Sequence, residues 1–452
     1  MTALRRYIQA LRGPGLLRAG AGTLAMKLVS VGVLFIATVA LTRLLGPAEY
    51  GVYIFVITLV GVFAEPQCVA LRTVAVRHAS RHLADGDDTA LTALVRDLRL
   101  ASLLGSGLAI LVLAVVGWLM APKFGATAVS VFALAALLPL LHAQSRINDG
   151  LLRAQGSTLL SQLPKLVLRP VLLIALVFGA AWLVHGPLDA AAAMMLQVAA
   201  VTGAAGFYGW LLRSRLGPQL KSATGIPRRQ LRLNELTPLI TATVLQVVES
   251  RAAVLLLGIL GSVSQTGQFH AALRVAELIA LTQGVASLLI EPLAARQAAS
   301  GDTRHLQRRL TQIARWVAFI SLPLTALIIG AREWLLLLFG EAFVEAAPVL
   351  AILALTQGLR ACLGTVGSLL NVTGHSRETI VGTGMGLVLQ LALGLWLIPL
   401  LGAVGAAWAA LISMTASKLY LMGRVHRRLH LYTSALGRWE DPRQWRRRCP
   451  QP

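Results

Sequence analysis

Long apolar segments follow one another along the whole chain, with only short gaps between them. A helix needs about 20 mostly apolar residues to cross about 30 Å of bilayer hydrocarbon, and this chain holds about twelve such segments. Their runs of Leu, Ala, Val and Gly are continuous, whereas strands of a membrane barrel alternate apolar and polar residues. The sequence therefore predicts an all-α polytopic membrane protein, with spans near 20–44, 49–72, 98–120, 125–147, 158–184, 190–212, 236–260, 268–291, 311–331, 347–371, 378–400 and 403–422.

Charged residues support this class and predict the orientation. Only 13% of residues are charged and 56% are hydrophobic, where a soluble domain has about 25% charged residues. The net charge of +22 would suggest nucleic-acid binding in a soluble protein, but here the basic residues gather in alternate gaps between the apolar segments. By the positive-inside rule these gaps and both termini face the cytoplasm, and we expect no nucleic-acid partner.

A central basic linker predicts the domain organisation. The stretch 213–232 is rich in Arg and contains two Gly and two Pro, so we place there the boundary between an N-terminal six-helix lobe, 1–222, and a C-terminal six-helix lobe, 223–430. Residues 431–452 form a basic cytoplasmic tail. Residues 4–18 have the spacing of a short interfacial helix, although a plain positive-inside anchor explains the same residues.

The two lobes resemble each other in sequence. Leu45-Gly46 followed by Gly51 corresponds to Leu260-Gly261 followed by Gly267, Leu151-Leu152 with Gly156 corresponds to Leu369-Leu370 with Gly374, and Arg99 corresponds to Arg315. All three landmarks share an offset of about 216 residues, which indicates a duplicated six-helix unit. Six helices return the chain to its starting side, so the repeats are parallel and we expect a central cavity between them as the substrate path.

Ionisable side chains inside the predicted spans are the candidates for chemistry. Such a side chain costs about 2.5–3.5 kcal/mol at the bilayer centre on insertion scales, so it usually faces a cavity or a partner. The four cations would form a cavity able to hold a diphosphate, because Arg and Lys replace lost phosphate hydration. The cations are Lys27, Arg251, Arg274 and Arg360, and the acids are Glu65, Glu249 and Glu277.

Some of these side chains have a competing structural explanation. Arg274 and Glu277 are three residues apart and can neutralise each other on one helix face. Glu249 and Arg251 are two residues apart and point in different directions, so at least one of them needs another partner. Glu65 is the most isolated acid, and it could bind H+ or Na+ for coupling or accept a hydrogen bond at a Pro66 kink.

Other cations lie near the ends of the predicted spans. A long basic side chain at such a position can reach the headgroup layer, so snorkelling is the default explanation for it. A place on the substrate path is the less favoured alternative. These residues are Arg43, Arg72, Lys165 and Arg169.

Signals of an enzyme or a metalloprotein are weak. The sequence has no phosphate-cradling glycine loop and no H-E-x-x-H helix, and its predicted outer loops are too short to carry a catalytic cluster. Cys68, Cys362 and Cys449 are too far apart for a metal site or a disulfide framework. We therefore expect no catalysis and no cofactor beyond a coupling H+ or Na+.

Several segments carry a family resemblance through their order and spacing along the chain. They are Thr42–Gly51, Thr266–Ala272, Glu291–Ala294, Gly301–Asp302, Leu338–Phe343, Leu369–Gly374 and Ile398–Ala407. With these segments the chain resembles the polysaccharide transporters of the multidrug/oligosaccharidyl-lipid/polysaccharide exporter superfamily, which includes Wzx-type O-antigen flippases. The resemblance implies two six-helix bundles around a central cavity.

The same resemblance implies a function and partners. A protein of this kind moves undecaprenyl-diphosphate-linked oligosaccharide across the bacterial inner membrane by alternating access, for lipopolysaccharide or exopolysaccharide synthesis. Its partners would be membrane lipid and a polysaccharide polymerase or glycosyltransferases. The basic tail could dock glycosyltransferases, but anchoring to anionic lipid is simpler. Two alternatives stay open: a cation-coupled multidrug or metabolite antiporter of the same superfamily and, less favoured, a membrane-integral polysaccharide polymerase or ligase.

Overall fold

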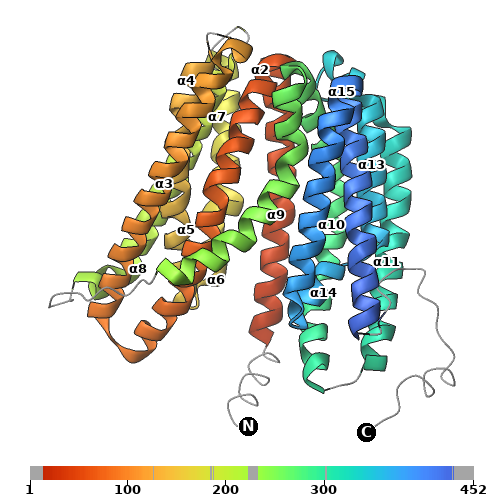
Figure 1. The fold of residues 1–452 in the computed structure, drawn as a ribbon. Helices are drawn as coiled ribbons and strands as arrows, with labels where there is room; N and C mark the ends of the chain where they lie inside the picture. Colours follow the sequence, from red (N-terminus) through yellow and green to blue (C-terminus); the bar gives the residue numbers. More distant parts are fainter. Residues whose placement is uncertain are drawn as a thin grey trace. The chain divides into compact units, whose positions relative to one another are not determined.

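Helices account for nearly all of the residues that a computed structural model of the chain describes, which are 14–125, 127–183, 186, 188–221, 233–300, 303–429 and 431. No strand occurs among them, so the predicted all-α fold is confirmed (Figure 1). The elements are α2 Pro14–Asp85, α3 Asp88–Phe124, α4 Ala128–Ala135, α5 Leu138–Ala154, α6 Thr158–Leu163, η1 Pro164–Leu168, α7 Arg169–Leu183, α8 Ala190–Lys221, α9 Leu233–Leu260, α10 Val263–Ser300, α11 Thr303–Gly330, α12 Arg332–Leu337, η2 Glu341–Ala346, α13 Ala347–Cys362, α14 Val366–Val372 and α15 Ser376–Leu429.

The two longest helices fold back at a glycine. α2 has 72 residues, and at 1.5 Å per residue a straight helix of that length would measure about 108 Å, over three times the hydrocarbon thickness. It turns at Gly46, whose φ of 71° and ψ of 175° are non-helical. Glycine accepts the positive φ, and the extended ψ suits the residue before Pro47. In the same way α15 turns at Gly402, with φ of 57° and ψ of −131°.

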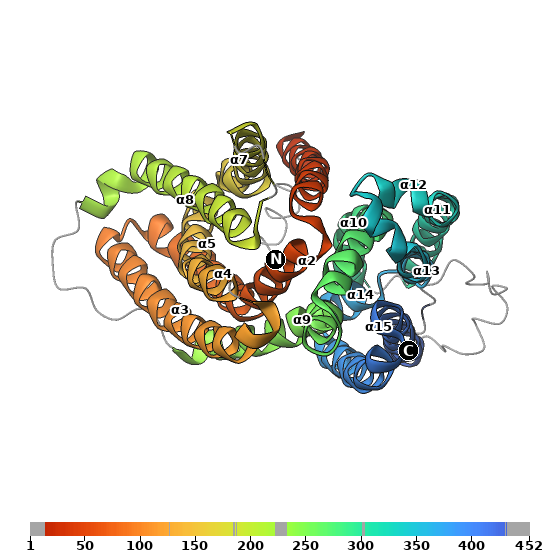
Figure 2. The ribbon, with the colours of Figure 1, turned by 90° about the horizontal axis from the view of Figure 1, so that it is seen from above.

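The described helices are long and apolar enough for a multi-pass membrane protein. Nine candidate membrane helices occur among the described residues. Two of them, α2 and α15, turn at Gly46 and Gly402, and we call the segments before and after each turn the first and second arm. With both arms counted, the nine helices provide eleven possible membrane crossings. α10 has 38 residues and is also long enough to cross a bilayer. Figure 2 shows the helices of each unit close to end-on.

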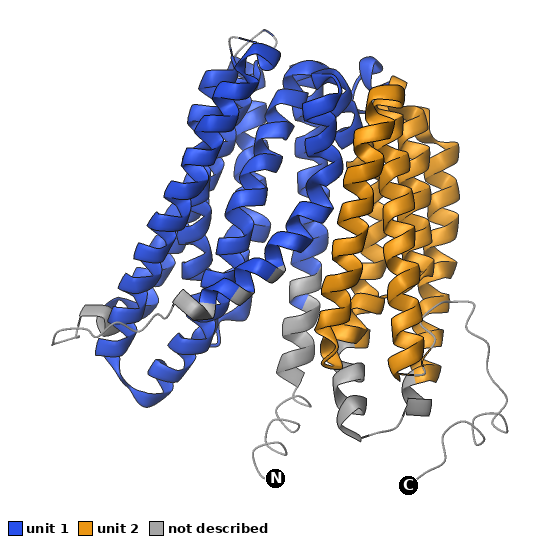
Figure 3. Cartoon of the chain, viewed as in Figure 1, with its two compact units in different colours: residues 1–271, 337–344 blue, residues 272–336, 345–452 orange. Residues whose placement is uncertain are grey.

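The chain divides into two compact units (Figure 3). Unit 1 comprises Met1–Ala271 and Leu337–Val344, and unit 2 comprises Ala272–Leu336 and Glu345–Pro452. The lobe boundary predicted at 222 and 223 lies outside the described residues, as do most of the predicted interfacial helix 4–18 and all of the tail except Leu431. α8 stays helical to Lys221, so the first nine residues of the predicted linker continue this helix, and the position of the lobe boundary stays a prediction.

Unit 1 has a core built from α2, α3, α5 and α8. The second arm of α2 lies directly against α5, because Gly150 of α5 has no side chain: a Cβ there would meet Ala75 Cβ at 2.7 Å and Arg72 O at 3.0 Å. This close approach places Asp149 beside Arg72. At the other end of the second arm, Asp87 caps α3 by accepting hydrogen bonds from Ala90 N at 2.9 Å and Thr89 Oγ1 at 2.6 Å.

Unit 2 has a second core, shared by α10, α11, α13, α14 and α15. Its central helix breaks between α13 and α14 at Gly364, which has a φ of 80°. Gln283 Nε2 of α10 donates to the backbone oxygens of Arg360, at 3.1 Å, and Gly364, at 3.2 Å. Lys418 Nζ of α15 also donates to Gly364 O, at 3.3 Å. These side chains satisfy carbonyl groups that the break leaves without helical partners.

Candidate functional site

One predicted candidate pair is an ion pair inside unit 1. Arg251 Nη2 of α9 donates to Glu65 Oε2 of α2 at 2.6 Å, and each side chain is about one third exposed. The prediction that Arg251 or Glu249 needs a partner elsewhere is confirmed for Arg251. The prediction that Glu65 is isolated is wrong, because the partner comes from a helix 186 residues away in the sequence, and sequence spacing contains no signal for it.

A second acidic centre lies on α5. Asp149 is only 3% exposed, and its Oδ1 accepts a hydrogen bond from Arg153 Nε at 2.8 Å. Arg72 Nη1 of α2 lies 4.0 Å from Asp149 Oδ2. A buried carboxylate needs such partners, since an unpaired charge away from water is costly. Arg153 and Arg72 therefore supply positive partners to Asp149 where α5 packs against α2.

Around these acids unit 1 carries more cations than the two carboxylates can neutralise. Arg146 of α5, Lys165 of η1 and Arg169 of α7 interact electrostatically with one another, and Lys165 also with Glu65 and Asp149. The three make no ion pair with another described residue. We call Arg72, Arg146, Arg153, Lys165, Arg169 and Arg251, with Glu65 and Asp149, the cation cluster.

Local backbone structure positions two of these cations. Pro164 begins the short π-helix η1, which separates α6 from α7, and a widened turn of this kind often marks a functional segment. Lys165 and Arg169 are four residues apart, so they share a face of this segment. That face is directed toward α2 and α5, because Lys165 interacts electrostatically with residues of both helices.

A half-buried histidine lies among the same cations. His142 Nε2 is buried and has no hydrogen-bond partner among the described residues. Arg146, Lys165, Arg169 and Arg251 all interact electrostatically with its ring. An unpaired polar atom beside several cations suits an anionic ligand, which could accept hydrogen bonds from all of them.

The other predicted site residues fall in both units. Lys27 is exposed on the first arm of α2, and Glu249 is half-buried on α9. In unit 2, Arg274 Nη1 donates to Glu277 Oε2 at 2.8 Å with both side chains 43% exposed, so the pairing expected from their spacing is confirmed. Arg360 on α13 is exposed and has no ion pair with a described residue. Whether these residues share a single cavity stays a prediction.

Sequence reasoning missed several members of the cation cluster. Arg146 falls just inside the predicted fourth span, but the positive-inside pattern assigned it with Arg153 to a cytoplasmic gap. Lys165 and Arg169 were expected to snorkel. A usable signal was present: Arg146, Asp149 and Arg153 recur at helical spacing, so one helix face carries two cations and one acid.

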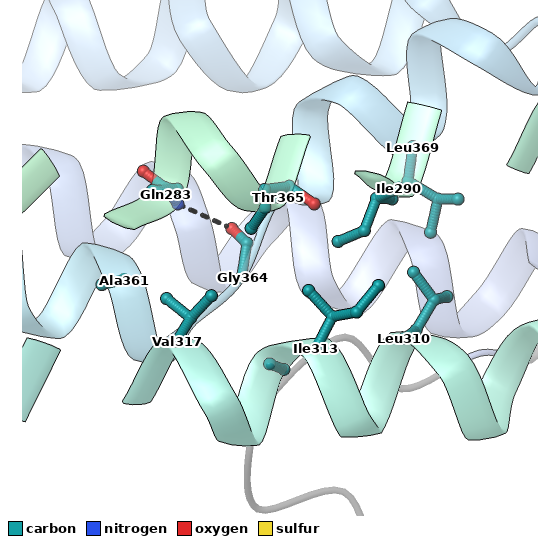
Figure 4. A pocket seen from close by; sticks show the side chains of 11 residues that line it. Gln283, Ile290, Leu310, Ile313, Val317, Ala361, Gly364, Thr365 and Leu369 are labelled. Carbon is teal, nitrogen blue, oxygen red and sulfur yellow. Dashed lines mark hydrogen bonds between the residues drawn. The ribbon is translucent and has the colours of Figure 1, made fainter. Parts of the chain in front are cut away.

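Unit 2 contains an apolar pocket instead of a charged site (Figure 4). Its wall is mostly aliphatic, and the labelled polar side chains are Gln283 and Thr365. Gln283 is engaged with Gly364 O, as the dashed line shows. The remaining lining residues are Ala286, Ile290, Leu310, Ile313, Ala314, Val317, Ala361, Gly364 and Leu369.

The described residues contain no cluster of three or more His, Cys, Asp or Glu that could hold a metal ion. Cys68 and Cys362 are free thiols, and Cys449 lies outside the described part of the chain. The cation cluster thus offers positive charge and hydrogen-bond donors to a ligand.

Comparisons with known proteins identify the family and the fold. A profile of the polysaccharide biosynthesis protein family matches residues 40–348, while no curated protein matches the chain. An inward-facing multidrug resistance MATE family transporter of the MOP superfamily superposes with a TM-score of 0.71 at 15% identity, covering 88% of this chain and 94% of its own. The lipid II flippase MurJ, in an inward closed conformation, gives 0.67 at 12% identity, covering 90% and 87%.

A third solved structure, a MOP superfamily transporter from Pyrococcus furiosus, gives a TM-score of 0.64 at 16% identity, covering 90% of this chain and 94% of its own. Identities this low compare folds only. The family match covers more than half of the chain and the fold likeness nearly all of it. The protein therefore belongs to the polysaccharide biosynthesis protein family and has the fold of the MOP superfamily transporters.

Proposed function

We propose that this protein is a flippase that moves undecaprenyl-diphosphate-linked oligosaccharide across the bacterial inner membrane by alternating access, for surface polysaccharide synthesis. Both termini would face the cytoplasm, by the distribution of basic residues between the spans. The observation that carries the proposal is the cation cluster of unit 1, where six cations surround two carboxylates. The family membership supports the polysaccharide pathway.

The cluster suits a diphosphate for physical reasons. A diphosphate crossing the bilayer loses its hydration, and charge-assisted hydrogen bonds from Arg and Lys replace it. Arg146, Lys165 and Arg169 form no ion pair with a carboxylate among the described residues, so we expect their donors to be available to a ligand. The protein would contribute binding and orientation and no bond-breaking step.

A complementation experiment tests this function. In a strain lacking the gene, the leaflet position of lipid-linked oligosaccharide would be measured with wild-type protein, Lys165→Ala, Arg169→Ala and Arg77→Ala. Arg77 is the matched control, because it is an exposed cation on α2 outside the cluster. We expect cytoplasmic accumulation with an empty vector and with both cluster variants, but not with wild-type protein or Arg77→Ala. An unchanged lipid-linked pool in the deletion strain would contradict the proposal.

A cation-coupled drug or metabolite antiporter is the second candidate, and the superposition on a MATE family transporter favours it. In that function Glu65 or Glu249 would bind the coupling H+ or Na+. Glu65 is already held by Arg251 at 2.6 Å, so a coupling ion would have to displace the guanidinium. Glu65→Gln should abolish export if this candidate is correct, and drug sensitivity of the deletion strain with intact surface polysaccharide would favour it. We place the polymerase or ligase alternative last.

A further inference from the structure

Two repeated turns pack against each other in unit 1. We call residues 43–53, around Gly46, turn A, and residues 258–270, around Gly261, turn B; the sequence offset of about 216 relates them. A Cβ on Gly51 of turn A would collide with Val263 O, and a Cβ on Gly267 of turn B would collide with Pro47 O. Gly51 corresponds to Gly267, and Pro47 to Val263. The two backbones therefore meet in a reciprocal contact that only glycine permits.

Two basic side chains form hydrogen bonds in the same region, and each donates to a backbone oxygen at the end of a helix. Lys123 Nζ, at the end of α3, donates to Gly258 O at 2.8 Å and Ile259 O at 2.6 Å. These carbonyl groups belong to the last turn of α9, where they lack helical partners and attract positive charge. Arg43 Nε of turn A donates to Leu338 O, just after α12, at 2.7 Å.

The two contacts are equivalent under the repeat. Arg43 corresponds to Ile259, and Leu338 corresponds to Pro122, the neighbour of Lys123. In both cases the end of the first helix of one repeat is tied to the end of the third helix of the other repeat. The donor side chain comes from the first repeat in both cases. The two contacts therefore join equivalent helix ends, although the residues that make them differ.

The hydrogen bonds of Arg43 and Lys123 are of a kind that can break and form again. Arg43 and Lys123 are exposed, and water can replace them on the backbone oxygens that they contact. The glycine contact is smooth, with no interlocking side chains at Gly51 or Gly267. Beneath it Tyr50 Oη shares a buried hydrogen bond with His270 Nδ1 at 2.8 Å, which would have to break on opening.

We call the contact between turns A and B the seam. Its position along α2 shows at which end of the second arm it lies. Glu65, the nearest acid of the cation cluster on this helix, is 19 residues past Gly46, or about 28 Å along the axis. The seam thus lies at the Gly46 end of the second arm of α2, and Glu65 lies farther along the same arm. Under the proposed topology the Gly46 end is the outer end.

We propose that turns A and B form an outer gate, that Lys123 and Arg43 are its latches, and that the turns separate when the transporter opens outward. The word outer rests on the proposed function and topology. The gate itself rests on the reciprocal turns and on the two repeat-equivalent latches.

A labelling experiment tests the gate without reference to substrate. Thr266 of turn B is 0% exposed, so Thr266→Cys, in a background without native cysteines, reports opening to a membrane-impermeant maleimide in intact cells. We expect labelling to be slow with both latches present and at least fivefold faster in Lys123→Gln/Arg43→Gln. Lys123→Arg should retain slow labelling, as should Arg77→Gln, an exposed cation elsewhere on α2. Unchanged labelling in the double variant would overturn the latches.

A buried control separates opening from general loosening. Ala354 of unit 2 is also 0% exposed, and Ala354→Cys should label equally slowly in every variant. Faster labelling at both reporters would mean loss of structure and would overturn the gate. Labelling of Thr266→Cys only in inverted vesicles would overturn the outer location.

A locking experiment provides the second readout. A cleavable bifunctional thiol reagent should join Arg43→Cys to Leu338→Cys and stop transport, and cleavage of the reagent should restore it. Each single-cysteine variant is the control. Full transport in the cross-linked protein would show a permanent seam and overturn the gate. If the maleimide results hold while lipid-linked oligosaccharide is unaffected, the gate stands and the proposed substrate fails.

Discussion

In unit 1 the cations outnumber their acidic partners, whereas in unit 2 most of the charged side chains described above are matched. Unit 1 holds Arg146, Lys165 and Arg169 together without an ion pair to a described residue. In unit 2 Arg274 pairs with Glu277, Glu378 binds both Arg424 and Arg428, Arg360 has no ion pair with a described residue, and the pocket is apolar. The two units are not the two predicted repeats, because α9 of the second repeat lies in unit 1 and contributes Arg251 to the cation cluster. A surplus of positive charge held together against its own repulsion is the feature that we propose an anionic ligand neutralises.

The sharpest way to break this comparison is to neutralise one cation in each unit. Arg146→Gln should weaken binding of a diphosphate-linked oligosaccharide to the purified protein by about 10- to 100-fold, since a hydrogen bond to a charged group is worth about 1.5–3 kcal/mol. Arg360→Gln in unit 2 should change it less than about twofold. Equal losses would show that the anion site also includes unit 2, as the sequence predicts for Arg360.

The next largest effect concerns the buried acid of the cluster. Asp149→Asn should lower the free energy of unfolding in detergent by about 1–3 kcal/mol, because Arg153 and Arg72 lose the carboxylate they share. Asp85→Asn, in an exposed pair with Arg81 at 3.8 Å, is the control and should change it by less than about 1 kcal/mol. A stable Asp149→Asn protein would mean that the acid serves only the ligand.

In unit 2 the corresponding weak point is the helix break. Gln283→Leu should lower the free energy of unfolding by about 0.5–1.5 kcal/mol, the net value of a typical hydrogen bond. The reason is that Arg360 O and Gly364 O lose the amide donor. Lys418 still donates to Gly364 O, which limits the loss. Thermal unfolding would measure this loss. Gln283→Asn keeps the amide group on a shorter side chain, so it separates the effect of side-chain length from that of the amide. A loss of unfolding free energy larger than that of Asp149→Asn would mean that the helix break of unit 2 contributes more to stability than the buried acid of unit 1.

The smallest expected effect is an acid dependence at the cap of α3. Hydrogen bonds from Thr89 and then Ala90 lower the pKa of Asp87 below its ordinary value of 3.8. A lowered folded pKa means that this stabilisation is present above pH 3.8 and is lost as the pH falls through the folded pKa. Asp87→Asn should therefore lose less stability on acidification than wild type, in paired unfolding measurements near pH 3 and pH 7. An identical acid response in both proteins would contradict this role.

How far the sequence predicted the site can be judged from particular residues. Arg274 and Glu277 were predictable, because their partner lies one helical turn away. The Arg251–Glu65 pair was not, since its members come from separate helices and periodicity says nothing of which helices adjoin. Lys123 was an exception to the charge pattern with no apparent role, and only the end of α9 beside it provides one.

The sequence by itself determined that the chain is all-α, that it belongs in a membrane and that its turns recur, because hydrophobic length, charge asymmetry and glycine spacing are local properties. It also predicted Gly46 and Gly261 as matching landmarks. Only the tertiary structure decided which cations come together, because that depends on Gly150 bringing α5 against α2 and on the π-helix directing Lys165 toward both. Helix packing joins residues far apart in the chain, and the energy of a buried charge depends on those neighbours.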